Sequence, residues 1–185
     1  ACGAILHYLG ETKHDKLKHI NKISRIDEDQ YVWLDKFTIR NLELYSSNSE
    51  NGKSLIDVID KTVSPMGSRL LKRWLALPLK NVDAIKERQA AVDYFVTNIE
   101  NRYEVASLLK EVGDLERLIS KVAALRANPR ELVHLKKSLL IINGIKEKIA
   151  SSKNPTLQKI ADQLNPCQLL TERLQNELNE EAPVN

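Results

Sequence analysis

The residues that most resemble a reaction centre are Gly52, Lys53 and Ser54, which have the types and order found at the end of a phosphate-binding loop. In such a loop the glycine lets backbone N–H groups approach the phosphates, the lysine reaches them, and the hydroxyl holds Mg²⁺. The full pattern needs another glycine five residues before Gly52, but Ser47 occupies that position. The preceding residues 41–45 read as the end of a helix and not as a central parallel strand. We therefore expect a surface loop, with a nucleotide-binding enzyme as an alternative that nucleotide titration calorimetry would test.

The histidines and cysteines form no stronger catalytic or metal-binding pattern. No histidine falls in an H-E-x-x-H sequence, and no Cys/His spacing closes a metal site. These residues are His7, His14, His19 and His134, with Cys2 and Cys167. Two solitary cysteines without a C-x-x-C pair are typical of a reducing compartment. We expect no catalytic residue, no cofactor-binding residue and no metal ligand in this chain.

A cluster of basic residues near the N-terminus could contact phosphate groups. It comprises Lys13, Lys16, Lys18, Lys22 and Arg25. The formal net charge is +3, and the whole excess of basic over acidic residues lies in the first 80 residues. Because no aromatic residues are interleaved with the cluster, a solvated loop is its simplest interpretation. A weak DNA or phosphate contact, in a stand-alone helical module that binds nucleic acid or protein, is the alternative.

Composition indicates the elements that would position these residues. The 185 residues include 6 Gly and 6 Pro, and 5% are aromatic. So few chain breakers and aromatic residues disfavour a β-sandwich or barrel. We predict an all-α, multi-helical bundle of about nine helices, with one short strand near residues 30–34. The longest apolar stretch, residues 74–79, is far shorter than the ~20 residues of a membrane span, so no membrane association is expected.

Two of the expected helices have clear apolar faces. One begins at Ser64-Pro65, a cap followed by a proline at the first helical position. Its predicted buried stripe is Met66, Leu70, Leu71, Trp74 and Leu75. The longest helix begins near Pro129, and its apolar seam is Leu132, Leu135, Leu139, Ile142, Ile145 and Ile149.

Several motifs, taken in order, are more specific than composition. They are L-D-x-x-T-x-R-N-L-E-L from Leu34, S-P-M-G-S-R-L-L-K-R-W-L from Ser64, V-G-D-L-E-R from Val112 and N-P-R-E-L from Asn128. Together they closely resemble the central core domain of the MutS family of DNA mismatch-repair proteins. The opening A-C-G-A-I-L-x-Y-L resembles the bacterial branch of that family.

The resemblance implies that residues 1–185 are the first part of a core, or lever, domain that ends just before the clamp insertion. Both ends of the chain look like cuts in a longer protein. The mismatch-binding and ATPase domains would be absent, so the fragment itself would not be an enzyme, and ATP and Mg²⁺ would belong to the ATPase domain of the longer protein. The segment would be a helical transmission element that links the connector, DNA clamp and ATPase parts of a protein that binds mismatched DNA and ATP.

The same resemblance implies partners and location. Mismatched double-stranded DNA would be bound through other domains, a MutL-type protein would be a partner, and the longer protein would be a homodimer. It would be cytoplasmic and associated with the bacterial nucleoid.

Four residues of the motifs are candidates for contacts between domains. Arg40 and Asn41 follow an expected helix cap at Asp35, where a guanidinium and an amide could bond to neighbouring backbone. Arg69 and Arg73 lie on one basic edge of the helix that follows Ser64. The simpler interpretations are satisfied buried carbonyls for the first pair and a solvated face for the second.

Overall fold

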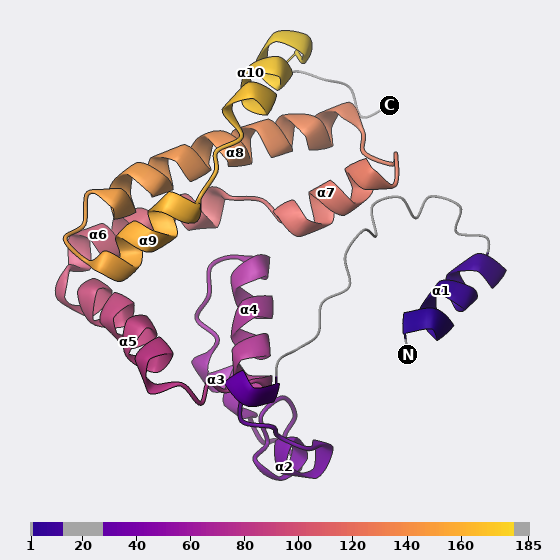
Figure 1. Ribbon diagram of the computed structural model, residues 1–185, viewed down its shortest axis with the longest axis vertical. Coiled ribbons are helices and arrows are strands. Elements are labelled where there is room, and N and C mark those ends of the chain that lie inside the picture. The colour runs from indigo at the N-terminus through magenta and orange to yellow at the C-terminus, as the bar shows by residue number, and fades with distance from the viewer. Residues whose placement is uncertain (1, 13–27, 180–185) are drawn as a thin grey trace.

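The computed structural model describes residues 2–12 and 28–179, and these are almost entirely helical (Figure 1). A 3-10 turn, η1, covers Glu28–Gln30. The α-helices are α1 Cys2–Glu11, α2 Lys36–Asn41, α3 Leu55–Ile59, α4 Pro65–Ala76, α5 Val82–Thr97, α6 Ile99–Glu111, α7 Leu115–Ala123, α8 Pro129–Ala150, α9 Pro155–Gln163 and α10 Gln168–Glu177. The prediction of an all-α, multi-helical fold is confirmed.

Helix starts lie where local capping signals place them. The side-chain oxygens of Ser64, Asp114 and Asn154 accept hydrogen bonds from backbone N–H groups in the first turns of α4, α7 and α9. Pro65 and Pro155 occupy the first helical positions, where no N–H is needed. Because these interactions span only a few residues, the sequence alone determines them.

The long helix α8 is the axis around which the C-terminal half is built. It has 22 residues, a length of about 33 Å, and packs against α6, α7, α9 and α10. One core cluster forms where α6, α8 and α9 meet, and it contains Val105, Ile149, Leu157 and Ala161. Leu157 is 3% exposed and Ala161 is 1% exposed.

The strand predicted near residues 30–34 is reduced to one antiparallel bridge, between Tyr31 and Leu79. Val32 N donates to Pro78 O at 2.7 Å, and Lys80 N donates to Gln30 O at 3.0 Å. Pro78 has no N–H, so it cannot extend the ladder as a donor. The aromatic and β-branched residues of this segment favour an extended backbone. A strand also needs a second segment that pairs with it along its length, and composition does not determine whether one is present.

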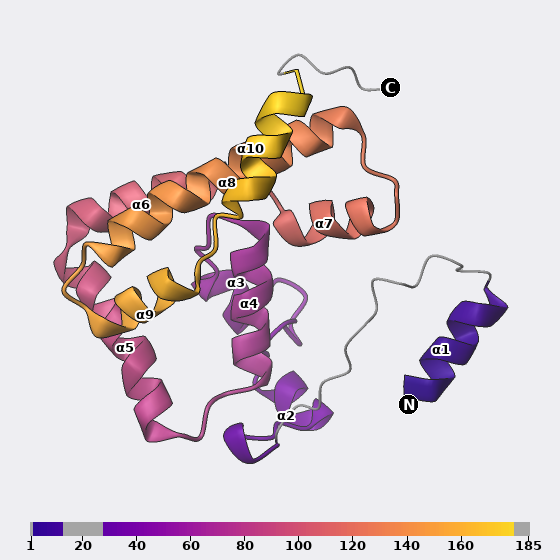
Figure 2. The same ribbon diagram turned by 45° about the horizontal axis from the view of Figure 1, so that its top comes forward.

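The predicted buried stripe of α4 is incorrect. No residue of α4 is fully buried, and Leu70 and Trp74 are 48% and 40% exposed. Figure 2 shows α4 beside the other helices, but no helix in the described part of the chain packs extensively against it. Periodicity identified the apolar face of α4, but it could not identify what covers that face.

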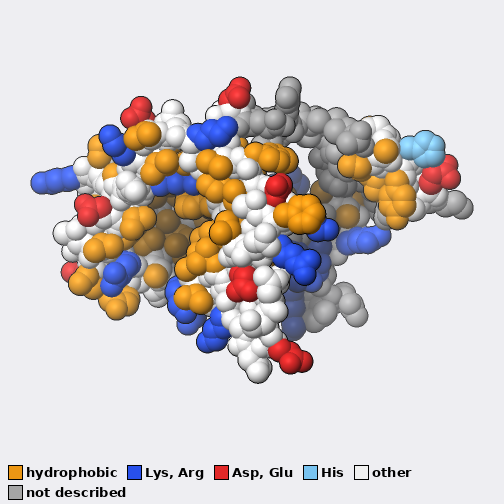
Figure 3. All heavy atoms as spheres, turned by 90° about the horizontal axis from the view of Figure 1, so that it is seen from below, with side chains coloured by type: hydrophobic (Ala, Val, Ile, Leu, Met, Phe, Trp, Pro, Cys, Tyr) orange, Lys and Arg blue, Asp and Glu red, His pale blue; other side chains and the backbone are white. Residues whose placement is uncertain are grey.

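Exposed hydrophobic side chains are common elsewhere in the described chain. Trp33, Phe37 and Tyr8 are 65%, 77% and 66% exposed. Figure 3 shows hydrophobic side chains interspersed with Lys and Arg over one face of the molecule. Among the helices described here, none has both the length and the apolar composition needed to traverse a lipid bilayer.

Candidate functional site

In the loop that resembles a phosphate-binding loop, the serine caps a helix of this chain. Ser54 is fully buried and is the N-cap of α3, where its Oγ donates to Asp57 Oδ2 at 2.6 Å. Asp57 N donates to Ser54 Oγ at 3.4 Å, and Ser54 N donates to Asp57 Oδ2 at 3.0 Å, so the two residues form a capping box. The serine hydroxyl is therefore engaged within the chain.

Gly52 is explained by close packing of the loop on itself. A Cβ at this position would lie 2.0 Å from Ser47 Oγ and 2.8 Å from Ser47 Cβ. Only glycine allows the loop backbone to approach Ser47 so closely. The glycine and the serine of the motif are both accounted for by local structure.

No metal-binding group forms in the described ranges 2–12 and 28–179: nowhere there do three His, Cys, Asp or Glu residues come together as ligands. His134 is exposed on α8, and Cys167 is an exposed free cysteine directly before α10. The basic cluster of Lys13, Lys16, Lys18, Lys22 and Arg25 lies outside the described residues, so its predicted phosphate contact stays a prediction.

The candidate contact residues on α2 are open to solvent. Arg40 and Asn41 are both exposed, and in the described part of the chain no hydrogen bond from either side chain is seen. The Arg40 carbonyl, in contrast, accepts from Asn48 Nδ2 at 3.4 Å and from Glu43 N at 3.0 Å. The interdomain contact of these two residues and the simpler interpretation, in which they bond to buried carbonyls at a domain junction, both stay predictions.

The two candidate arginines on α4 have different surroundings. Arg69 forms a forked pair with Asp114, with Nη1–Oδ2 at 2.9 Å and Nη2–Oδ1 at 2.7 Å. Its Nε also donates to Glu116 Oε2 at 2.8 Å. Arg73 is exposed, and no ion pair of its side chain is found within the described chain. Arg69 is thus engaged by this chain itself, whereas an interdomain contact of Arg73 remains a prediction.

Asp114 is the centre of this ionic cluster. The Arg69 guanidinium, followed by the backbone N–H of Arg117, holds the pKa of the Asp114 carboxyl below its ordinary value of 3.8. Hydrogen bonds from Arg69 to Asp114 and Glu116 raise the pKa of the guanidinium above its usual range. Asp114 Oδ1 also accepts from Arg117 N at 3.2 Å, which caps α7. One carboxylate therefore both starts α7 and fastens α4 to it.

The turn that carries Asp114 is held from the other side by α8. Gly113 N donates to Ser138 Oγ at 3.0 Å, and Ser138 is only 2% exposed. Sequence reasoning missed this bond and the Arg69 cluster, because the partners are 25 and 45 residues apart. The V-G-D-L-E-R motif gave a partial signal, since it places a glycine and two acids together.

Several hollows lie between helices of the described chain, and two of them involve residues of α4 or α10. The first, about 470 Å³, is lined by Ala91, Val92 and Phe95 of α5, Ile160 of α9 and Trp74 of α4. The Arg88 guanidinium lies over the Trp74 ring, with Cζ 3.8 Å from the centroid, as in a cation–π contact.

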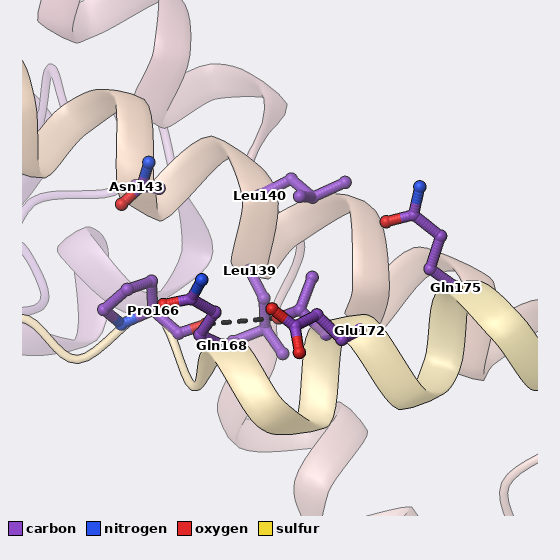
Figure 4. A pocket seen from close by; sticks show the side chains of 8 residues that line it. Leu139, Leu140, Asn143, Pro166, Gln168, Glu172 and Gln175 are labelled. Atoms are coloured by element: carbon purple, nitrogen blue, oxygen red, sulfur yellow. Dashed lines mark hydrogen bonds between the residues drawn. The ribbon is translucent and has the colours of Figure 1, made fainter.

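The second hollow, about 290 Å³, lies between α8 and α10 (Figure 4). Leu139, Leu140 and Asn143 of α8 face Gln168, Glu172 and Gln175 of α10 across it. Thr171 donates to the carbonyl of Pro166 at 3.2 Å and so fixes the start of α10. Neither hollow gathers a constellation suited to acid–base or nucleophilic catalysis.

Comparison with known proteins decides the family. A family model described as MutS domain III matches residues 37–185. The chain belongs to the MutS domain III family. Over its whole length it is 55% identical to the DNA mismatch repair protein MutS of Flavobacterium psychrophilum, 52% to that of Christiangramia forsetii and 53% to that of Flavobacterium johnsoniae.

The chain spans only 21% of the length of each of these MutS relatives. The resemblance inferred from the sequence motifs is confirmed. The motif arginine Arg69 and the V-G-D-L-E-R turn, which are far apart in the sequence, meet in this MutS domain III chain at the ionic cluster on Asp114.

Proposed function

We propose that this MutS domain III chain is the first part of the helical core of a mismatch-repair protein and transmits movement between its other parts. The observation that carries the proposal is the match of the entire chain, at 55% identity, to a protein named DNA mismatch repair protein MutS. The connector, the DNA clamp and the ATPase domain would be the parts that the core links. The chain itself would supply rigid connection and no catalysis.

The architecture of α8 supports this role. A helix about 33 Å long that packs against four others would move as one body, because a bend in it would disturb its packing against its neighbours. The helix starts with a capping box, in which Asn128 accepts from Glu131 N at 2.9 Å and Glu131 accepts from Asn128 N at 3.2 Å. A helix fixed in this way can transmit a displacement from one end to the other.

In this proposal the ligands belong to the rest of the longer protein. Mismatched duplex DNA, ATP with Mg²⁺ and a MutL-type protein would be bound by other domains of a homodimer in the bacterial cytoplasm. The chain would influence these events only through the positions of its helices.

A chimera tests the proposal. The corresponding segment of Flavobacterium psychrophilum MutS would be replaced by this chain, and ATP-induced release from mismatched DNA would be measured. We expect the chimera to retain release and Ser138→Pro to lose it while ATP hydrolysis continues, because proline in the interior breaks α8. Ser138→Ala is the matched control, since it removes the hydroxyl without breaking the helix. Normal coupling in a folded Ser138→Pro chimera would contradict the proposal.

A second measurement concerns the chain alone. We expect no binding of labelled duplex DNA in a gel-shift titration at micromolar concentration. Salt-sensitive binding there would instead favour the module built on the basic cluster near the N-terminus.

A further inference from the structure

The described chain contains two parts that are joined by few contacts. The first, which we call the α2–α4 unit, covers residues 28–80. The second, the α5–α10 bundle, covers residues 82–177. Extensive helix–helix packing in the described residues occurs within the bundle, and no such pair joins the bundle to the unit. Figures 1 and 2 both place α4 between α5 on one side and α7 on the other.

The covalent link between the two parts lies at Lys80–Asn81. The bridge between Tyr31 and Leu79 ties the chain to the α2–α4 unit up to this point. Lys80 N still donates to Gln30 O at 3.0 Å, whereas Asn81 already caps α5 through Ala84 N. A rotation of the unit therefore needs backbone change at only one or two residues.

On its α5 side, the unit is not packed tightly against the bundle. The 470 Å³ hollow separates Trp74 from Val92, Phe95 and Ile160, and Val92 is 62% exposed. The Arg88 guanidinium, stacked on Trp74, bridges this gap. The side chains at this joint are therefore not locked by close packing, which in a protein interior resists movement.

On its α7 side, the unit is fastened by charge. Arg69 places three N–H donors on two carboxylates that both lie at the start of α7. The planar guanidinium matches the fork of Asp114, which fixes direction as well as distance. The turn that bears Asp114 is in turn anchored to α8 by Ser138.

We propose that Arg69 and Asp114 form an intramolecular latch that sets the orientation of the α2–α4 unit relative to the α5–α10 bundle. When the latch opens, the unit swivels about Lys80–Asn81. Because Ser138 holds the other side of the turn, the latch ties α4 to the longest helix of the chain. This inference concerns the geometry of the chain itself and does not rest on the proposed role in mismatch repair.

The latch is accessible to solvent and can therefore open. The side chains of Arg69, Asp114 and Glu116 are 47%, 21% and 69% exposed. Water and salt compete for such groups far more effectively than for a buried pair.

The test measures a distance between the two parts in the 185-residue chain. Cys2→Ser and Cys167→Ser remove the native thiols, and Lys61→Cys and Lys137→Cys add spin labels at exposed positions on the unit and on α8. Double electron–electron resonance then gives the distribution of label separations. We expect one narrow distribution with the latch intact.

Two variants open the latch in different ways. Arg69→Gln removes the guanidinium, and Asp114→Asn removes the charge while keeping a residue that can cap α7. Both are expected to lose the narrow distribution and to populate additional separations. Arg73→Gln is the matched control, because it removes the same charge from an exposed position on the same helix, and it should keep the narrow distribution.

Unchanged distributions in folded Arg69→Gln and Asp114→Asn chains would overturn the proposal, as would an equal broadening by Arg73→Gln. Circular dichroism establishes whether each variant folds. If neither latch variant folds, the chain with an intact latch is measured in low salt and in about 1 M salt, where screening acts over only about 3 Å. Broadening in high salt would then support the latch, and its absence would refute it.

Discussion

The contact between Gly113 and Ser138 allows a quantitative test of the joint between α7 and α8. Ser138→Ala removes the acceptor of a half-buried N–H at a site where the side chain is 2% exposed. An N–H left without its partner costs about 1–3 kcal/mol, and the better helix propensity of alanine offsets a few tenths of this. We expect Ser138→Ala to lower the free energy of unfolding by about 1–2 kcal/mol.

Gly113→Ala perturbs the same contact from the other side. An added Cβ would lie 3.2 Å from Ser138 Oγ and 3.8 Å from Leu118 Cδ1. The first distance is tight enough to push the hydroxyl away by a few tenths of an ångström. Gly113 does not have a positive φ, so the backbone accepts alanine without strain. Alanine lowers the conformational entropy of the unfolded chain, which by itself stabilises the folded state by about 0.4–1 kcal/mol. The net cost should be between about 0 and 1 kcal/mol.

The double variant distinguishes this geometry from a general weakening. With Ser138→Ala in place, the crowding oxygen is gone, and Gly113→Ala should become neutral or stabilising. The two changes should therefore be non-additive by about 1 kcal/mol, within the range found for residues in contact. Urea unfolding followed by far-UV circular dichroism, which reports the helices of the bundle, measures all four free energies. Gly10→Ala is the control partner, because a Cβ there meets nothing within 4 Å.

If the changes in unfolding free energy of Gly113→Ala and Ser138→Ala add to within about 0.3 kcal/mol, the two positions are not coupled through the Ser138 hydroxyl, and the reasoning is refuted. A coupling of the same size with Gly10→Ala would also refute it.

The other predictions concern the core, one strained residue and pH. Leu157→Ala should lower the free energy of unfolding by about 2–5 kcal/mol in a urea titration, because Leu157 is 3% exposed in the α6–α8–α9 core. As a control in the same titration, Leu125→Ala, at a position that is 78% exposed, should change it by less than about 0.5 kcal/mol. Leu125→Gly should instead raise it by about 0.5–1 kcal/mol, because Leu125 has a φ of 56°, and a rise in thermal midpoint would check this. Arg69 lowers the pKa of Asp114, and Lys121 lowers the pKa of Glu131. The stability that the two carboxylates contribute to the fold is therefore present above their ordinary pKa values of 3.8 and 4.5, and it is lost as pH falls through their lower folded pKa values. Acid titration of Asp114→Asn should show a smaller loss below pH 3.8 than the unchanged chain, and an equal loss would contradict the assignment.

Local capping motifs made the helix starts predictable from the sequence, whereas contacts between residues far apart in the sequence could not be predicted. Ser64-Pro65 and Asn154-Pro155 define α4 and α9 because a cap and its N–H partners lie within three residues. The apolar seam of α8 is likewise confirmed at Leu135, Leu139, Ile145 and Ile149, which are all buried. Here periodicity succeeded because four helices surround α8.

The same reasoning failed for α4, although its pattern is as regular. A stripe of apolar residues shows which face of a helix can be buried, but burial depends on neighbours contributed by distant segments. In α4 those neighbours are absent from the described residues, and Trp74 stays 40% exposed. The Arg69 cluster could not be predicted for a related reason, since 45 residues, including the whole of α5 and α6, separate Arg69 from Asp114.

The loop at Gly52 shows why residue type and spacing do not determine chemistry on their own. A phosphate-binding loop and this loop both need a glycine where backbone must approach another group, and a hydroxyl at the start of a helix. Here the approached group is Ser47 and the hydroxyl bonds to Asp57, so both requirements are met inside the protein. The feature that separates the two cases is the element upstream. A parallel strand would present the loop to a ligand, whereas here α2 ends at Asn41 and a turn and bends at residues 42–46 lead into the loop. Asp57→Ala would therefore free the Ser54 hydroxyl without creating a nucleotide site, because in the described residues no parallel strand precedes the loop to support such a site.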